Sequence, residues 1–287
     1  MVTGAQGGSV ARALLEDGNF LVRAVTRDTS KPAARKLEEA GAEVVAADLD
    51  DKESVEAALL EAYGAFVVTV WDNSNKDKEI TQGKLFADLS KQLDLKHVVF
   101  SGLENVKKLT EGKLEVPHFD SKGELEEYFR SIGVPMTSVR LPYYYENLLT
   151  TRPQKSTDRN TYDLCLPMGD VPLDGISVAD LGPVVVSILK CPPLFIGKVI
   201  GLSAEKLTVE QYAAIMSKVT GKNIQDAKIS PEAYEKLGSP GSTPMANMFR
   251  FYITKPDRNV SITRELNPKV KTFHQWCEEN KDKYKDL

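Results

Sequence analysis

The chain opens with MVTGAQGG, residues 1–8, which continues directly into SVARALLE, residues 9–16. Gly4 and Gly7 stand immediately before a stretch with helical periodicity, and this is typical of a turn that presents backbone N–H groups to a phosphate. Gly4 would let the phosphate approach the backbone, and the N–H groups of Ala5 and Gln6 would point at it. A site of this kind also needs a buried strand before the glycine turn, and that strand is absent from this sequence.

Downstream, short β-branched runs alternate with amphipathic stretches. Strands are expected over residues 20–26, 42–48, 65–70, 97–101 and 136–141, and helices over 31–39, 54–63, 84–89 and 122–131. Repeated strand–helix–strand units of this length predict an α/β fold with a doubly wound, mostly parallel sheet. The absent first strand is central in the common strand order, so its loss should split the sheet. We expect residues 1–150 to form this dinucleotide-binding domain and 151–287 a smaller α+β part with a substrate-binding or regulatory role.

Composition excludes several classes of protein. The net charge of −4 lacks the basic excess of a nucleic-acid-binding protein, and the apolar runs are too short to cross a membrane. The cysteines and histidines are dispersed, which argues against a disulfide framework or a metal site and for a cytoplasmic protein. These residues are Cys165, Cys191 and Cys277, and His97, His118 and His274.

The end of the strand expected over residues 20–26 bears on the choice of cofactor. Arg27 stands twenty residues after Gly7 and is followed by Lys31. An acidic residue at this position accepts hydrogen bonds from the ribose of NAD, whereas arginine accommodates the additional phosphate of NADP. Asp28 leaves NAD open, and both cations could instead be ordinary surface charges. We favour NADP.

Later strand ends should approach the same ligand, because ligands of open α/β sheets gather at the carboxyl ends of the strands. Asp48 and Leu49 end one strand, and Thr69, Val70 and Trp71 end the next. Trp71 could equally be a half-buried aromatic residue without a ligand role.

Four segments resemble the NmrA-like family, a group of atypical short-chain dehydrogenase/reductases with a Rossmann-type fold. They are TGAQG at 3–7, FSGLEN at 100–105, RLPYYYEN at 140–147 and GDVP at 169–172. The sequence departs from the family in lacking the first strand and the first glycine of the loop. The resemblance implies that NADP(H) is bound by Thr3, Gly4, Ala5, Gln6, Arg27, Lys31, Asp48, Leu49, Thr69, Val70, Trp71, Lys122, Tyr144, Tyr145, Glu146 and Asn147.

The resemblance also implies a redox sensor more than a turnover enzyme, located in the cytoplasm with the nucleus as an additional location. Cofactor occupancy would control conformation, homodimer formation and the binding of a regulated partner, with argininosuccinate synthase as the implied partner.

A catalytic role depends on one helix. Enzymatic short-chain reductases use Tyr-x-x-x-Lys, in which the lysine lowers the pKa of the tyrosine that transfers a proton. Here Lys122 is present, but His118 replaces the tyrosine, so we favour a non-catalytic protein. Two alternatives stay open: an NADP-dependent reductase similar to isoflavone-reductase-like enzymes that uses Lys122, and a pure protein-interaction module.

Overall fold

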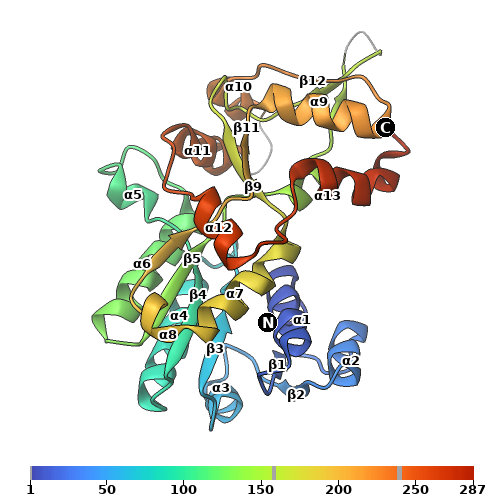
Figure 1. Cartoon of the computed structure of the whole chain (residues 1–287). Helices are drawn as coiled ribbons and strands as arrows, with labels where there is room; N and C mark the ends of the chain where they lie inside the picture. The colour runs from blue at the N-terminus through green and yellow to red at the C-terminus, as the bar shows by residue number, and fades with distance from the viewer. Residues whose placement is uncertain (1, 157–159, 238–240) are drawn as a thin grey trace. The chain divides into compact units, whose positions relative to one another are not determined.

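The computed structural model describes residues 2–156, 160–237 and 241–287 and forms two compact units (Figure 1). The first unit takes the chain up to Asn105, then Pro117–Arg140 and Val178–Ile200. The second unit takes Val106–Val116, Leu141–Ser177 and Gly201–Leu287. The sequence predicts one boundary after residue 150, whereas the contacts place residues 141–150 in the second unit and return 178–200 to the first.

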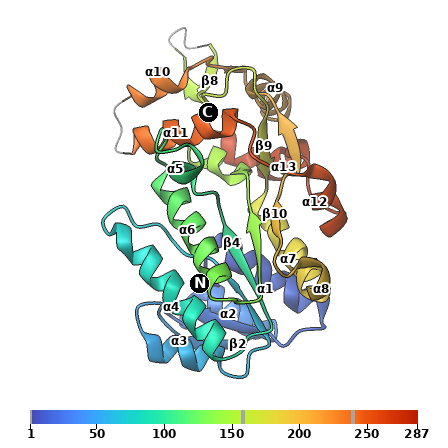
Figure 2. The same cartoon turned by 90° about the vertical axis from the view of Figure 1, so that its left-hand side faces the viewer.

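The first unit has the predicted α/β architecture. Its elements are α1 (Ala5–Asp17), β1 (Arg23–Thr26), α2 (Pro32–Glu39), β2 (Glu43–Ala46), α3 (Lys52–Leu59), β3 (Gly64–Val67), α4 (Lys76–Gln92), β4 (His97–Gly102), α6 (Pro117–Ser131), β5 (Met136–Arg140), a 3-10 turn (Val178–Asp180), α7 (Leu181–Lys190), α8 (Pro192–Phe195) and β10 (Val199–Gly201). Both views show α4 and α6 side by side along the sheet (Figures 1 and 2). The α/β fold class is therefore confirmed.

The sheet is split, as the sequence predicts. β1 and β2 form a parallel pair, while β10, β5, β4 and β3 form a separate four-stranded sheet in that order. Among the described residues, no strand lies between β1 and β3. Between them lies a pocket of about 890 Å³ that is open to solvent on one side and is lined mainly by apolar groups of α1, β1, α3 and β3. The N–H of Val2 donates to the Val25 carbonyl at 3.0 Å, so the residues just before α1 lie beside the end of β1.

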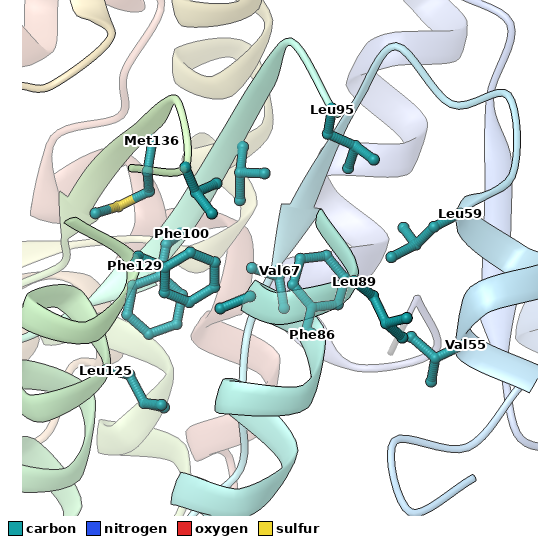
Figure 3. Close-up of a cluster of buried hydrophobic side chains, with 13 residues drawn as sticks. Val55, Leu59, Val67, Phe86, Leu89, Leu95, Phe100, Leu125, Phe129 and Met136 are labelled. Carbon is teal, nitrogen blue, oxygen red and sulfur yellow. The ribbon is translucent and has the colours of Figure 1, made fainter. Parts of the chain in front are cut away.

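The main hydrophobic core lies between the four-stranded sheet and helices α4 and α6 (Figure 3). The rings of Phe100 on β4 and Phe129 on α6 stack with their centroids 5.2 Å apart. The two helices approach closely at Gly83, where a Cβ would lie 2.4 Å from the Leu125 Cδ1 atom. This packing holds the middle of α4 against α6.

A second contact fixes the start of α1. Ser9 Oγ donates to the Ala179 carbonyl at 2.8 Å and accepts from the Gly182 N–H at 2.9 Å. At Gly182 on α7 a Cβ would lie 2.3 Å from the Ser9 carbonyl oxygen, so only glycine allows this approach. Helix α7 thereby holds α1 by its backbone as well as by side chains.

The second unit is a smaller α+β structure, as predicted. Its elements are α5 (Val106–Leu109), β6 (Tyr143–Tyr144), a 3-10 helix (Tyr145–Leu149), β7 (Gln154–Lys155), β8 (Tyr162–Leu164), β9 (Leu173–Ile176), β11 (Glu205–Leu207), α9 (Val209–Thr220), β12 (Ile224–Asp226), α10 (Pro231–Glu235), α11 (Ser242–Ile253), α12 (Val260–Leu266), α13 (Phe273–Asn280) and a 3-10 turn (Lys281–Tyr284). Two small sheets run in the orders β11-β9-β6 and β12-β8-β7. None of the described helices in either unit is long and apolar enough to span a bilayer.

Candidate functional site

The first turn of α1 presents its positive end to solvent. The N-cap is Gly4, which has no side chain that could cap the helix, and the first turn contains no acidic residue. The first N–H that the helix itself satisfies is that of Gly8, which donates to the Gly4 carbonyl at 2.8 Å. Gly4 and Ala5 are exposed, and Thr3 and Gln6 are half-buried. A helix start of this kind favours an anion.

Two exposed cations follow β1 next to this turn. Arg27 comes directly after the strand, and Lys31 is the N-cap of α2. Asp28 Oδ1 accepts from the N–H of Ser30 at 2.9 Å and from its hydroxyl at 2.6 Å. These hydrogen bonds lower the pKa of Asp28 and turn its carboxylate toward its own loop. The backbone of Val2 is hydrogen-bonded to that of Val25 near the end of β1. The glycine turn after Val2 and Arg27 after Thr26 therefore lie at the same end of this strand.

The predicted site residues after β2 and β3 differ in how far they are exposed to a ligand. Asp48 is half-buried and accepts from the Asp50 N–H at 3.1 Å, while Leu49 packs on the main core. Val70 is 68% exposed, and the half-buried Trp71 donates from Nε1 to the Asn73 side chain at 2.6 Å. Val70 is accessible to a ligand and Trp71 is partly so, whereas the Leu49 side chain packs mainly in the core.

The structure brings Thr69 and Lys122 into direct contact. The Lys122 ammonium donates to the Thr69 carbonyl at 2.8 Å and to its hydroxyl oxygen at 3.1 Å. The third partner is the carboxylate of Glu79 on α4, whose side chain is fully buried. Glu79 also accepts from the hydroxyls of Thr69, at 2.6 Å, and Ser121, at 2.5 Å. The loop after β3 is thus tied to both α4 and α6.

Burial dominates the electrostatics of this cluster. It lowers the pKa of Lys122, and the Glu79 carboxylate opposes that effect. Burial, with the Lys122 cation beside it, also lowers the pKa of His118 to about 4. The imidazole is therefore neutral at pH 7 and is a poor general acid there.

The other predicted residues, Tyr144 to Asn147, belong to the second unit. Tyr145 is fully buried, and its ring packs against Phe273 and Trp276 with centroids 5.0 and 5.8 Å away. Glu146 Oε1 accepts from the Ser177 hydroxyl at 2.6 Å and from Trp276 Nε1 at 3.3 Å. Tyr144, Glu146 and Asn147 are half-buried. The Tyr145 side chain thus packs in the core of this unit and does not present its ring to a ligand.

Sequence reasoning missed Glu79. On α4 it shares one helical face with Gly83, Phe86 and Ser90, all of which are buried. A carboxylate on the inward face of a helix is rare unless it is paired, so a helical plot of residues 76–92 would have identified it.

Comparisons with known proteins agree with this geometry. The family model for the NmrA-like family matches residues 2–277. The rat NmrA-like family domain-containing protein 1 is 30% identical over 285 residues, which cover 99% of this chain and 95% of that protein. An NmrA-like family domain-containing oxidoreductase, FrzB from Cladobotryum, is 31% identical over 280 residues, with 89% and 83% of the two chains covered.

A solved structure of NmrA, described as a negative transcriptional regulator in complex with NADP, is similar with a TM-score of 0.82. The two chains are 20% identical, and the match covers 99% of this chain and 94% of that one. At this identity the match supports the fold alone. The full-length family match and the rat relative together carry the assignment: the chain belongs to the NmrA-like family.

Proposed function

We propose that this protein binds NADP(H) and acts as a redox sensor, in which cofactor occupancy controls conformation, homodimer formation and partner binding. The observation that carries the proposal is the open N-terminus of α1 next to the exposed pair Arg27 and Lys31. A helix start binds a pyrophosphate, and a guanidinium beside it accommodates a ribose phosphate. The side chains present fit such a ligand.

Each part of the first unit has a distinct role in this proposal. The turn from Thr3 to Gln6 would hold the pyrophosphate, and Arg27 with Lys31 the additional phosphate of NADP. Asp48 and Leu49 would border the adenine end, and Thr69 to Trp71 with Lys122 the nicotinamide end. A contribution from Tyr144 to Asn147 remains a prediction from the family. The cofactor supplies hydride chemistry when bound, while the residues of this chain bind and orient it.

A sensor rather than a turnover enzyme is favoured by His118. The reductase dyad needs a phenol at this position, and the imidazole that replaces it is neutral at pH 7 because burial and the Lys122 cation lower its pKa to about 4. A sensor requires only that the cofactor bind two states of the protein with different affinity.

Calorimetry with NADPH, NADP⁺ and NADH tests the proposal. We expect NADPH to bind more tightly than NADH, and R27A to lose about ten-fold in NADPH affinity while NADH is little changed, because one charge-assisted contact is removed. K36A is the matched control, since Lys36 is an exposed cation of α2 outside the site. Absence of NADPH binding, or equal loss for both cofactors, would contradict the proposal.

The regulatory part needs its own measurement. Sedimentation velocity with and without NADPH should show a change in the fraction of dimer, and binding of purified argininosuccinate synthase should differ between the two conditions. Oligomeric state and partner affinity that do not respond to NADPH would refute the sensor role while leaving cofactor binding intact.

A second candidate function is an NADP-dependent reductase that uses Lys122. The buried position of this lysine and its lowered pKa favour it, because a desolvated lysine can act as a base. Loss of substrate-dependent NADPH oxidation in K122A would support this candidate, and unchanged turnover would refute it.

A further inference from the structure

Glu79 is a buried charge that the proposed function does not yet use. It lies in the first turn of α4 with no exposed side-chain surface. Its helical face otherwise carries Gly83, Phe86 and Ser90, so an apolar side chain would suit this position. A buried carboxylate destabilises a fold unless it is paired and hydrogen-bonded, so Glu79 requires partners for its charge.

The partners satisfy both carboxylate oxygens. Oε1 accepts from the Thr69 hydroxyl at 2.6 Å and from the Lys122 ammonium, and Oε2 accepts from the Ser121 hydroxyl at 2.5 Å. These donors come from the loop after β3 and from α6. One side chain therefore connects three segments of the first unit.

The same set of contacts uses all the hydrogen-bond donors of Lys122. An ammonium has three N–H donors, and they meet three acceptors: the Thr69 carbonyl, the Thr69 hydroxyl and Glu79. The Lys122 side chain is 12% exposed. Among the described residues, the titratable groups that influence it are Glu79 from α4 and His118 from α6, while the loop after β3 contributes the uncharged Thr69.

We propose that Glu79 is a positioning residue of the cofactor site: it holds the Lys122 ammonium on the Thr69 carbonyl and thereby fixes the loop from Thr69 to Trp71. The inference rests on the proposed function, since this loop is the part expected to border the nicotinamide. Lys122 then shapes the site as a cation bound within the protein. The paired Glu79 carboxylate opposes deprotonation of Lys122, so this arrangement disfavours the second candidate function, in which Lys122 acts as a base.

The test measures how readily the Lys122 amine is acetylated across a pH series, with quantification of the Lys122 peptide by mass spectrometry. Only the neutral amine reacts, so the pH midpoint reports its protonation. In E79Q the buried ammonium loses its counter-charge, and we expect the midpoint to move to lower pH. T69V removes one acceptor with little change in shape and should shift it in the same direction by less.

E124Q is the matched control. Glu124 lies on α6 near Lys122 in sequence, is 52% exposed, and pairs with Lys84 at 3.2 Å. The same change of charge there should leave the Lys122 midpoint unchanged. In E79Q, NADPH affinity should also fall roughly ten-fold, because the loop from Thr69 to Trp71 is no longer pre-ordered for the cofactor.

The outcomes separate this inference from the proposed function. If wild-type protein binds NADPH but the Lys122 midpoint is the same in E79Q and T69V as in wild type, the inference is wrong and the proposed function stands. If wild-type protein binds no NADPH, the proposed function and the site role of Glu79 fail together, whatever the midpoint shows. T69V decides the question if E79Q does not fold.

Discussion

The half-buried His118 predicts an acid-sensitive step in stability. Burial and the neighbouring Lys122 cation lower the pKa of this imidazole to about 4 in the folded protein, from its ordinary value of 6.5. The unfolded chain therefore binds a proton at a higher pH than the folded one. The contribution of the neutral His118 side chain to the free energy of unfolding is complete above pH 6.5 and is lost as the pH falls toward 4.

The size of the effect follows from the two pKa values. A difference of one pKa unit corresponds to about 1.4 kcal/mol, so the full loss amounts to about 3 kcal/mol. Solvent near the partly exposed ring makes this an upper value. His97, whose pKa is also lowered by burial, acts in the same direction and adds to the total.

Urea unfolding at pH 8, 6.5, 5 and 4.5 measures the effect. The variant H118Q should be destabilised relative to wild type at pH 8, where the imidazole is neutral in both states and only packing is lost. Between pH 6.5 and 4.5 wild-type stability should fall more steeply than that of H118Q, so that the difference between them narrows or reverses. Parallel pH profiles of the two proteins would refute this account of His118.

Two further predictions concern packing. F129A removes a ring that stacks on Phe100 in the main core and should lower the free energy of unfolding by about 3–5 kcal/mol; a loss below 1 kcal/mol in urea titration would contradict the packing. G182A places a Cβ 2.3 Å from the Ser9 carbonyl oxygen and 2.7 Å from the Ala13 Cβ and should cost about 1–3 kcal/mol. The matched control for G182A is S187A on the same helix, and equal stability of the two variants would show that α1 and α7 can separate without cost.

Much of the first unit is predictable because its strands and helices repeat a simple pattern. The alternation of β-branched runs and amphipathic stretches predicts the order of elements and the split sheet. Boundaries are less predictable: the strand expected over 20–26 begins at Arg23, and the helix expected over 54–63 spans Lys52–Leu59. Its cap is Asp51, whose carboxylate accepts from the N–H groups of Glu53 and Ser54, and the adjacent Asp50 offers the same side chain, so the sequence alone does not select between them.

The candidate site was only partly accessible to such reasoning. The strand-end residues follow from the rule that ligands meet the carboxyl ends of strands. Glu79 lies inside a helix, and its role depends on Thr69 and Lys122, which are far away in the sequence. Tyr145 shows the opposite problem, because a motif match cannot tell an aromatic side chain that faces a ligand from one that packs in a core.

The pocket between β1 and β3 has a consequence for cooperativity. The pocket of about 890 Å³ lies where packing would otherwise join β1 to β3, and the apolar residues around β1 form a cluster separate from the main core. β1 pairs with β2 but with no other strand among the described residues, so few ladder bonds join β1, α2 and β2 to the remainder of the first unit. Local opening should therefore release this segment before the four-stranded sheet, and its amides should exchange with solvent earlier than those of β4.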